Sequence, residues 1–288
     1  MLREVGQQEE IGTPLSAVVD HQSLRHCAQV FIDTMNRLSS EVENKFWLKQ
    51  DGSVVSHFEQ QIEQVVGDYL RRTTPFISVI GEEGYSYQVQ GSRLTWLIDP
   101  IDGSISFKSG LDSYSFVATL IKETDDGTET PVAAMIVLPE KNNKIFTAVK
   151  DEGVQRNGRY LPSIRELPEP HHKSIICRSD SYTFSMAGRS EWREKLDKLD
   201  GDKSSLGICR TITDMHAHTL VAEGICALKV DAACADWDRY PAELLVREAG
   251  GMSIFIPCKN PDRDLSGSLI VGHPRLVQQI AELLGVEA

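Results

Sequence analysis

The chain of 288 residues lacks any apolar run that approaches the roughly 18 residues of a membrane-spanning helix. Its first residues, Met1 to Glu10, hold three glutamates and no apolar run, so no signal peptide is expected there. Positive charge is also scarce: 30 Lys and Arg stand against 42 Asp and Glu, a formal net charge of -12. Such a chain repels the phosphate backbone of nucleic acids. We therefore expect neither a membrane nor a nucleic-acid polymer as its partner.

Paired cysteine motifs are missing as well. None of the six cysteines forms a C-x-x-C pair, which excludes zinc ribbons and thioredoxin-type motifs. A chain of this length with 41% hydrophobic residues can bury a core without disulfide bonds. We therefore expect a cytoplasmic protein with reduced, mostly buried cysteines. The six are Cys27, Cys177, Cys209, Cys226, Cys234 and Cys258.

Helical and strand patterns alternate along the chain, which predicts a layered α/β architecture. Apolar residues recur with helical spacing over 16–43 and 56–72. Short runs rich in β-branched residues predict buried strands at 76–80 and 94–98. Further strands are expected at 115–122, 131–138, 144–149, 173–177, 206–209, 225–231, 252–256 and 269–271, and further helices at 191–199, 213–223, 240–249 and 274–284.

A stretch rich in proline and charge, 161–172, predicts a linker between two lobes. The N-terminal lobe is expected to span 14–160 and to carry most of the functional carboxylates. The C-terminal lobe is expected to span 173–288. Residues 1–13 are polar and are expected to form a flexible tail.

Acidic residues directly follow the two early strands. Gly81-Glu82-Glu83 follows the first, and Asp99-Pro-Ile-Asp102 follows the second. We expect Pro100 to force a turn, because it fixes φ and cannot donate to a strand ladder. Carboxylates that converge at strand ends suit hard cations such as Mg²⁺, and two such ions can clamp both oxygens of a phosphoryl transfer. A lone D-P-x-D-G run is more often a simple turn than a metal site.

Gly103 and Ser104 come directly after these carboxylates. Glycine permits a tight turn or the close approach of a ligand. Ser104 stands at a potential helix N-terminus, where exposed N–H groups can hold a phosphate without any lysine. Metal ions and amides would thus let an acidic protein bind an anionic group.

Four segments, in this order along the chain, resemble the signature elements of the inositol monophosphatase superfamily, which includes histidinol-phosphatase and sugar-bisphosphatase relatives. Each segment alone is weak, but their combination from residue 49 to residue 251 is specific. The segments are Lys49-Gln-Asp-Gly-Ser-Val-Val-Ser56, Gly81-Glu-Glu83, Asp99-Pro-Ile-Asp-Gly-Ser-Ile-Ser-Phe107, and Trp237-Asp238 followed by Ala242-Glu-Leu-Leu-Val-Arg-Glu-Ala-Gly-Gly251.

The resemblance implies an αβαβα layered sandwich and a magnesium-dependent phosphatase. Such an enzyme hydrolyses a small phosphate monoester, of the inositol, cyclitol, histidinol or sugar phosphate type, to an alcohol and inorganic phosphate. The resemblance also implies two or three Mg²⁺ ions, with Mn²⁺ as a substitute, inhibition by lithium, and a homodimer.

The resemblance further implies a set of metal ligands. Glu82 and Asp99, with the carbonyl of Ile101, are expected to hold the first magnesium ion. Asp99, Asp102 and Asp238 are expected to hold the second, and Glu82 also supports a more loosely held third. Asp102 thereby belongs to the catalytic set.

Gly103 and Ser104 are expected to offer backbone N–H groups to the phosphate. Glu83 is expected to contact the metal ligands without binding the metal itself. Glu59 and Ser104 stand where the family usually has Asp and Thr, a pair that orients the attacking water. The carboxylate and the hydroxyl are both kept here, although the glutamate reaches one methylene further. The alternative is that Glu59 is a solvated residue of the second helix.

The segment that is expected to contact the substrate departs further from the family pattern. Asp214 falls in the segment that is usually G-S-A, and Asp231 falls where an acidic residue contacts a substrate hydroxyl. We hypothesise that Asp214 recognises an amine or several hydroxyls beside the phosphate. The alternative is that Asp214 merely caps a helix. Arg210 is a candidate for a second anionic group, whereas His216 and His218 are expected to be core or pocket-lining residues.

Two other functions remain open from the sequence. The first is a 3′-phosphonucleotide or fructose-1,6-bisphosphate-type phosphatase. The second is a non-catalytic protein that binds metal and sugar phosphate, which only the altered Glu59 supports. Four converging carboxylates favour a metal site in every case, because they repel one another unless a cation is bound.

Overall fold

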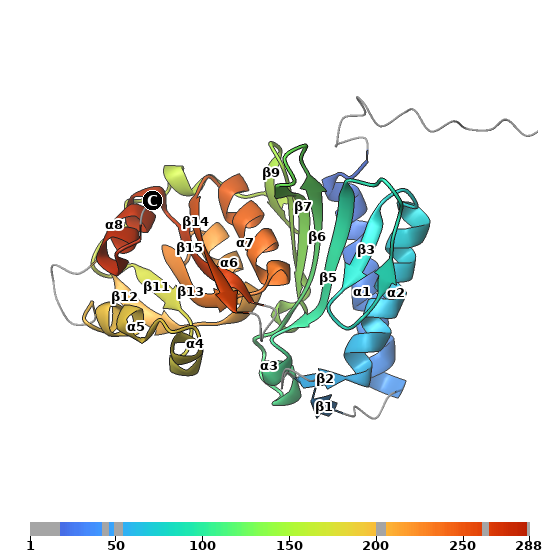
Figure 1. Ribbon diagram of the computed structural model, residues 1–288, viewed down its shortest axis with the longest axis horizontal. Coiled ribbons are helices and arrows are strands. Elements are labelled where there is room, and N and C mark those ends of the chain that lie inside the picture. Colours follow the sequence, from blue (N-terminus) through green and yellow to red (C-terminus); the bar gives the residue numbers. More distant parts are fainter. Residues whose placement is uncertain (1–17, 42–45, 49–53, 200–205, 261–264, 287–288) are drawn as a thin grey trace, which may run out of the picture.

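The computed structural model of the protein describes residues 18–41, 46–48, 54–199, 206–260 and 265–286. Within these ranges the molecule has five layers in the order helix, sheet, helix, sheet, helix (Figure 1). The predicted αβαβα architecture is therefore confirmed. The segment 49–53, where a turn was predicted, and the predicted tail 1–13 lie outside the described residues.

The N-terminal sheet has eight strands in the order β10-β9-β8-β7-β6-β5-β3-β4. All neighbouring pairs are antiparallel except β3 and β5, which run parallel. Acidic residues at the carboxyl ends of β3 and β5 therefore emerge at one edge. The strands are β3 (Ser78–Gly81), β4 (Ser86–Tyr87), β5 (Leu94–Asp102), β6 (Ser115–Glu123), β7 (Glu129–Leu138), β8 (Lys144–Val149), β9 (Gly153–Arg156) and β10 (Arg159–Tyr160).

The C-terminal sheet has five strands in the order β12-β11-β13-β15-β14, and β12, β11 and β13 are parallel. The chain leaves β11 through helices on one face and returns from β12 to β13 through a helix on the other face. The carboxyl ends of β11 and β13 thus open a crevice, the usual ligand position in such sheets. The strands are β11 (Ile175–Arg178), β12 (Ile208–Thr211), β13 (Leu228–Cys234), β14 (Met252–Asn260) and β15 (Leu265–Gly272).

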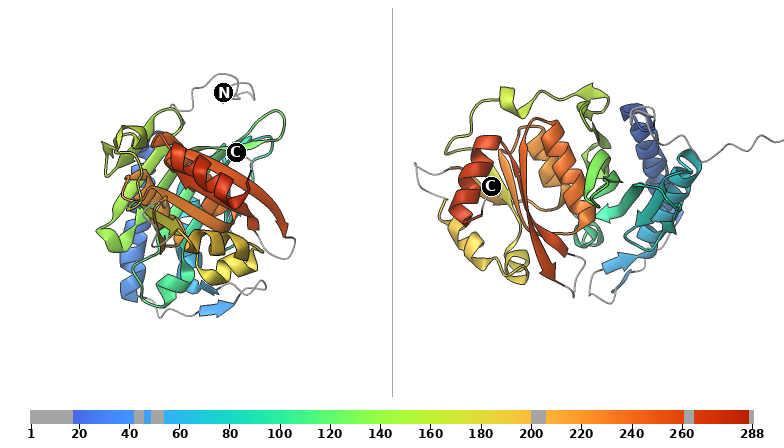
Figure 2. Two further views of the ribbon diagram at one scale, coloured as in Figure 1. Left: turned by 90° about the vertical axis from the view of Figure 1, so that its left-hand side faces the viewer. Right: turned by 45° about the horizontal axis from the view of Figure 1, so that its top comes forward.

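The helices complete the layers (Figure 2). α1 and α2 pack on the outer face of the N-terminal sheet, α6 and α7 lie between the two sheets, and α5 and α8 pack on the outer face of the C-terminal sheet. The middle layer shares one apolar core with both sheets, which fixes their relative position. The helices are α1 (His21–Glu41), α2 (His57–Thr73), α3 (Ser104–Lys108), α4 (Ser181–Met186), α5 (Ser190–Asp197), α6 (Asp214–Ala222), α7 (Asp236–Glu248) and α8 (Pro274–Leu284).

Three local features differ from the sequence predictions. The turn predicted at Pro100 is wrong: β5 continues through it to Asp102, and a shift of register against β6 accommodates the proline. The predicted linker 161–172 packs on the fold, because Ile164 is buried and its amide donates to the carbonyl of Ala249. Helix α4 was not predicted; its first turn is capped by the side chain of Asp180.

Two smaller features complete the fold. A hairpin of β1 (Phe46–Leu48) and β2 (Val54–Ser56) forms a separate small sheet near α3. All six cysteines are free, and all but Cys258 are buried, as the sequence predicted. Among the helices of the described ranges, none has the length and apolar character to cross a membrane.

Candidate active site

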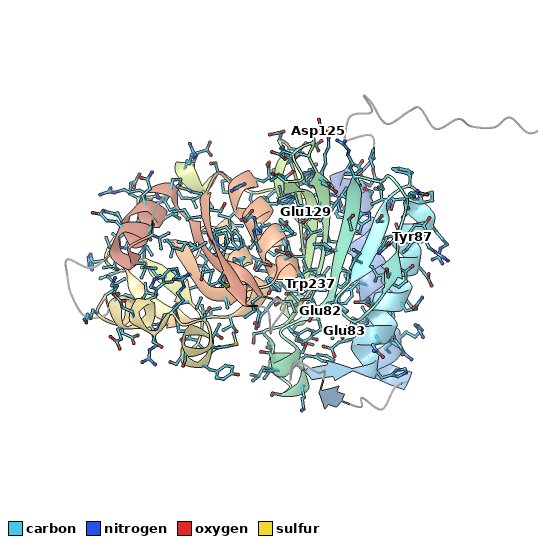
Figure 3. All side chains as sticks on the ribbon, viewed as in Figure 1. Glu82, Glu83, Tyr87, Asp125, Glu129 and Trp237 are labelled. Carbon is cyan, nitrogen blue, oxygen red and sulfur yellow. The ribbon has the colours of Figure 1, made fainter. Side chains whose placement is uncertain are left out.

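Three carboxylates meet where β5 ends and α7 begins. Asp99 and Asp102 lie in the last part of β5, and Asp238 is in the first turn of α7. One oxygen from each of the three lies within 4.8 Å of the others. Figure 3 labels Trp237, the neighbour of Asp238, next to Glu82 and Glu83 at the boundary between the two sheets.

The irregular end of β5 brings two of these carboxylates together. Residues three apart on a regular strand point to opposite faces. Here Asp99 is opposite Val117 and Asp102 is opposite Ser115, so three steps on β5 match two on β6. This bulge turns both carboxylates toward the same site, in keeping with the frequent occurrence of bulges beside active sites.

The cluster is electrostatically strained without a cation. Burial raises the pKa of Asp99 well above its ordinary value, and the charges of Glu82, Asp102 and Asp238 raise it further. Burial and then the charge of Glu82 raise the pKa of Asp238 to about 7. A divalent cation with oxygen preference relieves this repulsion, so the three side chains fit magnesium in number, type and charge.

Asp102 also connects the two halves of the molecule. Its Oδ2 accepts hydrogen bonds from the Ser115 hydroxyl and from the Met215 amide of α6, each at 2.6 Å. Burial raises its pKa, followed by the charges of Asp214 and Asp238. The carboxylate cluster is therefore in direct contact with the first turn of α6.

The loop that carries Glu82 is held by a carboxylate that was not predicted from the sequence. Glu63 of α2 is 2% exposed and accepts the amides of Glu83 at 2.7 Å and Tyr85 at 2.6 Å. The Glu82 amide donates to the carbonyl of Ile98 at 3.0 Å. Glu63 stands four residues after Glu59, hence on the same helix face, and that spacing was the available signal.

Gly103 adopts a backbone conformation that favours glycine, with φ at 89°. A Cβ at this position would lie 2.9 Å from the carbonyl oxygen of Ser113 and 3.0 Å from Oδ2 of Asp214. The adjacent Ser104 begins α3, and its hydroxyl donates to the carbonyl of Ile101 at 3.2 Å. Asp214 therefore reaches directly to the segment expected to hold the phosphate.

Glu59 lies in the first turn of α2 and is only 1% exposed. The alternative of a solvated position is therefore wrong. Its neighbour Phe58 contacts Phe107 of α3 with ring centroids 5.4 Å apart. This contact packs the first turn of α2 against the helix that Ser104 begins.

Asp214 is the first residue of α6 and has a left-handed backbone, with φ at 61°. Its Oδ2 accepts the Thr213 hydroxyl at 2.9 Å, and burial raises its pKa. The capping alternative finds no support, because Thr213 is the N-cap residue and the Met215 amide donates to Asp102. The carboxylate faces Gly103 and Asp102 instead.

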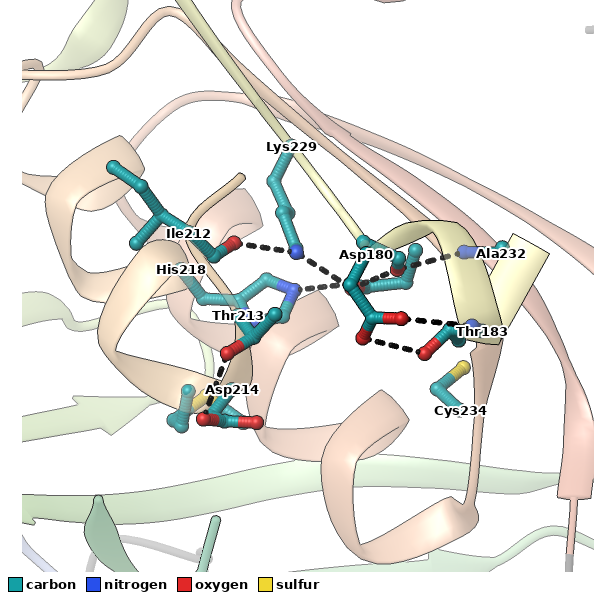
Figure 4. Close-up of polar contacts among 12 residues, drawn as sticks. Asp180, Thr183, Ile212, Thr213, Asp214, His218, Lys229, Ala232 and Cys234 are labelled. Atoms are coloured by element: carbon teal, nitrogen blue, oxygen red, sulfur yellow. Dashed lines mark hydrogen bonds and ion pairs between the residues drawn. The ribbon is translucent and has the colours of Figure 1, made fainter. Parts of the chain in front are cut away.

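Asp231 is buried in an ionic group with Lys229 and His218, two residues that Figure 4 labels. Its Oδ1 is 3.0 Å from Nζ of Lys229, and its Oδ2 is 2.8 Å from Nε2 of His218. Burial alone raises its pKa, but Lys229 and His218 outweigh burial and hold it at about 2. Both oxygens are thus engaged inside the protein, which does not favour the expected contact with a substrate hydroxyl. His218 is a core residue, as predicted.

Three further residues near the site are Lys229, Arg210 and Glu83. Lys229 was missed by the sequence reasoning, although its place two residues before Asp231 puts both on one face of β13. Arg210 is exposed on the edge strand β12 and donates to the carbonyl of Cys209 at 2.7 Å. Glu83 is half-buried beside Glu82.

Comparison with known proteins agrees with this geometry. The family model of the inositol monophosphatase family matches residues 17–285. A histidinol-phosphatase of Streptomyces coelicolor is 29% identical over 221 residues, which cover 76% of this chain and 79% of that protein. The Nus factor SuhB of Escherichia coli is 27% identical over 238 residues, 80% of this chain and 82% of SuhB.

Solved structures show the same fold. The extragenic suppressor protein suhB of Bartonella henselae matches with a TM-score of 0.73 at 19% identity, covering 91% of this chain and 97% of that one. An IMPase of Thermotoga maritima matches with a TM-score of 0.72 at 17% identity, covering 92% and 95%. The chain thus belongs to the inositol monophosphatase family and is a magnesium-dependent phosphatase of small phosphate monoesters.

Proposed function

We propose that the physiological substrate is the phosphate ester of a small alcohol that carries an amine, as histidinol does, or several hydroxyls. The observation that supports this is the position of Asp214. Its carboxylate reaches the Gly103 segment beside the metal cluster, and no helix-capping bond occupies it. A relative named histidinol-phosphatase agrees with an amine-bearing substrate.

We propose the following ligand set. Glu82, Asp99 and the carbonyl of Ile101 hold one magnesium ion, and Asp99, Asp102 and Asp238 hold another. A third ion near Glu82 and replacement by Mn²⁺ are part of the same proposal. Bound magnesium supplies positive charge that neutralises the phosphate oxygens and lowers the pKa of water.

The remaining groups orient the reactants. The amides of Gly103 and Ser104 donate to the phosphate, in the manner of backbone N–H groups at anion sites. Glu59 and the Ser104 hydroxyl orient the water that attacks phosphorus in line. Because Glu59 is buried, its surroundings restrict the position of its carboxylate. Glu83 supports Glu82 through the backbone that Glu63 binds, and Arg210 lies at the rim for any second anionic group.

The proposal extends to properties of the whole protein. We expect lithium to inhibit the enzyme, two chains to form a homodimer, and the protein to act in the cytoplasm. We also keep the division into an N-terminal lobe, 14–160, and a C-terminal lobe, 173–288. Sedimentation of the purified chain and phosphate release with added LiCl test the dimer and the inhibition.

The substrate class is tested by a matched pair of esters, histidinol phosphate and the same ester without the amine. A charge-assisted hydrogen bond contributes about 1.5–3 kcal/mol, so kcat/KM should favour the amine by about tenfold or more. Asp214→Ala should remove the preference, while Asp33→Asn, at an exposed position of α1, should keep it. Equal efficiency for both esters, unchanged in Asp214→Ala, would refute the amine hypothesis.

A further inference from the structure

We propose that Lys229 is a positioning residue for the phosphatase reaction. It fixes the turn 212–215, so that the carboxylate of Asp214 faces the phosphate side of the site. Asp231 then serves as the internal counter-ion of Lys229 rather than as a substrate contact. The role of Asp214 in this inference rests on the proposed function.

Lys229 is buried in an apolar environment. It is 0% exposed and lies on β13 opposite Cys177 of β11 and Val271 of β15. These two residues belong to the apolar core beneath α6 and α7. An ammonium group in such a place is costly unless every bond is well made, so its partners carry the reason for its presence.

Lys229 contacts Asp231 and the carbonyl of Ile212, and the two contacts have different consequences. Asp231, at 3.0 Å, balances its charge. The carbonyl of Ile212, at 2.8 Å, accepts a hydrogen bond and belongs to the segment that leads into α6. The second bond also holds the backbone just before Asp214, which a bond to Asp231 alone would not do (Figure 4).

The turn is held at both ends. Lys229, on the C-terminal sheet, binds the carbonyl of Ile212. Asp102, on the N-terminal sheet, accepts the hydrogen bond of the Met215 amide. Between them, Asp214 has a φ of 61°, which is uncommon for a residue other than glycine. Such a conformation persists only where the surroundings determine it strongly. Lys229 is therefore one of the two groups that keep Asp214 turned toward Gly103.

The charges around the turn support the same division of roles. Asp231 is engaged by Lys229 on one oxygen and by His218 on the other. Its charge is thus compensated inside the protein. Asp214 accepts a hydrogen bond from the hydroxyl of Thr213, lies beside Gly103, and its charge raises the pKa of Asp102. We therefore expect a cationic or hydroxyl-bearing group of the substrate to bind Asp214 rather than Asp231.

The test separates positioning from charge balance with a double variant. Lys229→Met alone leaves a buried carboxylate unpaired and can fail to fold. Lys229→Met with Asp231→Asn removes both charges, keeps the side-chain volumes, and leaves an oxygen for His218. Lys229→Arg is the conservative control, because it keeps a donor for the Ile212 carbonyl. Tm, kcat and KM are measured for each with histidinol phosphate and its amine-free counterpart.

We expect the double variant to have a higher Tm than Lys229→Met. Its KM for the amine-bearing ester should rise about tenfold, by more than kcat falls, and its preference for the amine should approach that of Asp214→Asn. Adding Asp214→Asn to the double variant should reduce the preference for the amine little further, because both sets of substitutions remove the same interaction between Asp214 and the substrate. Lys229→Arg should recover part of the preference.

Two outcomes would overturn the inference. One is a double variant that recovers Tm and keeps the wild-type KM and preference, which would make the pair purely structural. The other is a loss of amine preference in the double variant that adds in full to the loss caused by Asp214→Asn when the substitutions are combined. If the wild type does not prefer the amine, the proposed substrate class fails instead. The additivity of the 229 and 214 changes in KM for the amine-free ester then still tests the positioning role.

Discussion

The amide of Met215 donates a 2.6 Å hydrogen bond to Oδ2 of Asp102, across 113 residues of sequence. Asp102 thus belongs to the cluster of three carboxylates and also binds the first turn of α6, where a helix favours negative charge. Asp214 immediately precedes Met215, so the proposed metal and substrate groups share a single rigid contact.

Substitution of Gly103 by alanine should destabilise the protein, and the same substitution at Gly110 is the control. Gly103→Ala should lower stability by about 1–3 kcal/mol from backbone strain, with a further loss from steric clash. The clash arises because the new Cβ would meet the Ser113 carbonyl at 2.9 Å and Asp214 at 3.0 Å. Gly110→Ala has a similar φ of 71° and open space around it, so it carries strain alone. Urea unfolding and phosphate release should show a larger loss for Gly103→Ala; equal losses in both would contradict the close approach of Asp214.

Glu63 should control the affinity for magnesium without being a ligand. Glu63→Ala removes a carboxylate that accepts two amides, each bond being worth about 1.5–3 kcal/mol. We expect weaker stability and a higher magnesium concentration for half-maximal activity, because the Glu82 segment loses its anchor. Gln60→Ala, at an exposed position of the same helix, is the control. A normal magnesium requirement in Glu63→Ala would show that the loop holds its shape without this anchor.

The stability of the metal-free protein should depend on Asp238. Its folded pKa is about 7, raised from 3.8 by burial and by Glu82. A raised pKa means that the folded state binds more protons than the unfolded state between about pH 4 and 7, so stability falls as pH rises through this window. In EDTA, Tm should fall over that range, and Asp238→Asn should flatten the decline. A parallel decline in the variant would mean that other groups cause it.

Asp231 should show the opposite dependence. Lys229 and His218 hold its pKa at about 2 despite burial. The lowered pKa stabilises the fold above the unfolded value near 4, and this contribution is lost as pH falls toward 2. Asp231→Asn should therefore be less stable than the wild type at pH 7, with the gap narrowing below pH 4. A gap that stays constant down to pH 2 would argue against the buried ionic group.

The sequence predicted the parts of the site that depend on local patterns. Asp99, Asp102, Asp238 and Glu82 lie in short motifs, and the alternation of helices and strands was enough for the five layers. The bulge between Asp99 and Asp102 was missed, because it depends on pairing with Val117 and Ser115 of another strand. A proline in an apolar run favours a turn locally, and tertiary pairing overrides that preference.

The missed residues share a physical reason. Glu63 and Lys229 are charged residues in patterns that predict a helix face and a strand. Their roles arise from backbone groups distant in sequence, the Glu83 and Tyr85 amides and the Ile212 carbonyl. Burial of a charge is visible only after the fold has placed its partners. The same limit applies to Asp231, whose engagement by His218 changes what its carboxylate can contact.

The central claim is that Asp99, Asp102 and Asp238 form the magnesium site of a phosphatase. Calorimetric titration of the protein with MgCl₂, without substrate, tests it most directly when Asp99→Asn is compared with Asp33→Asn. We predict magnesium binding in the wild type and in Asp33→Asn, and binding weakened by at least about tenfold in Asp99→Asn, with phosphate release lost in the same variant. Unchanged magnesium binding in Asp99→Asn would contradict the account.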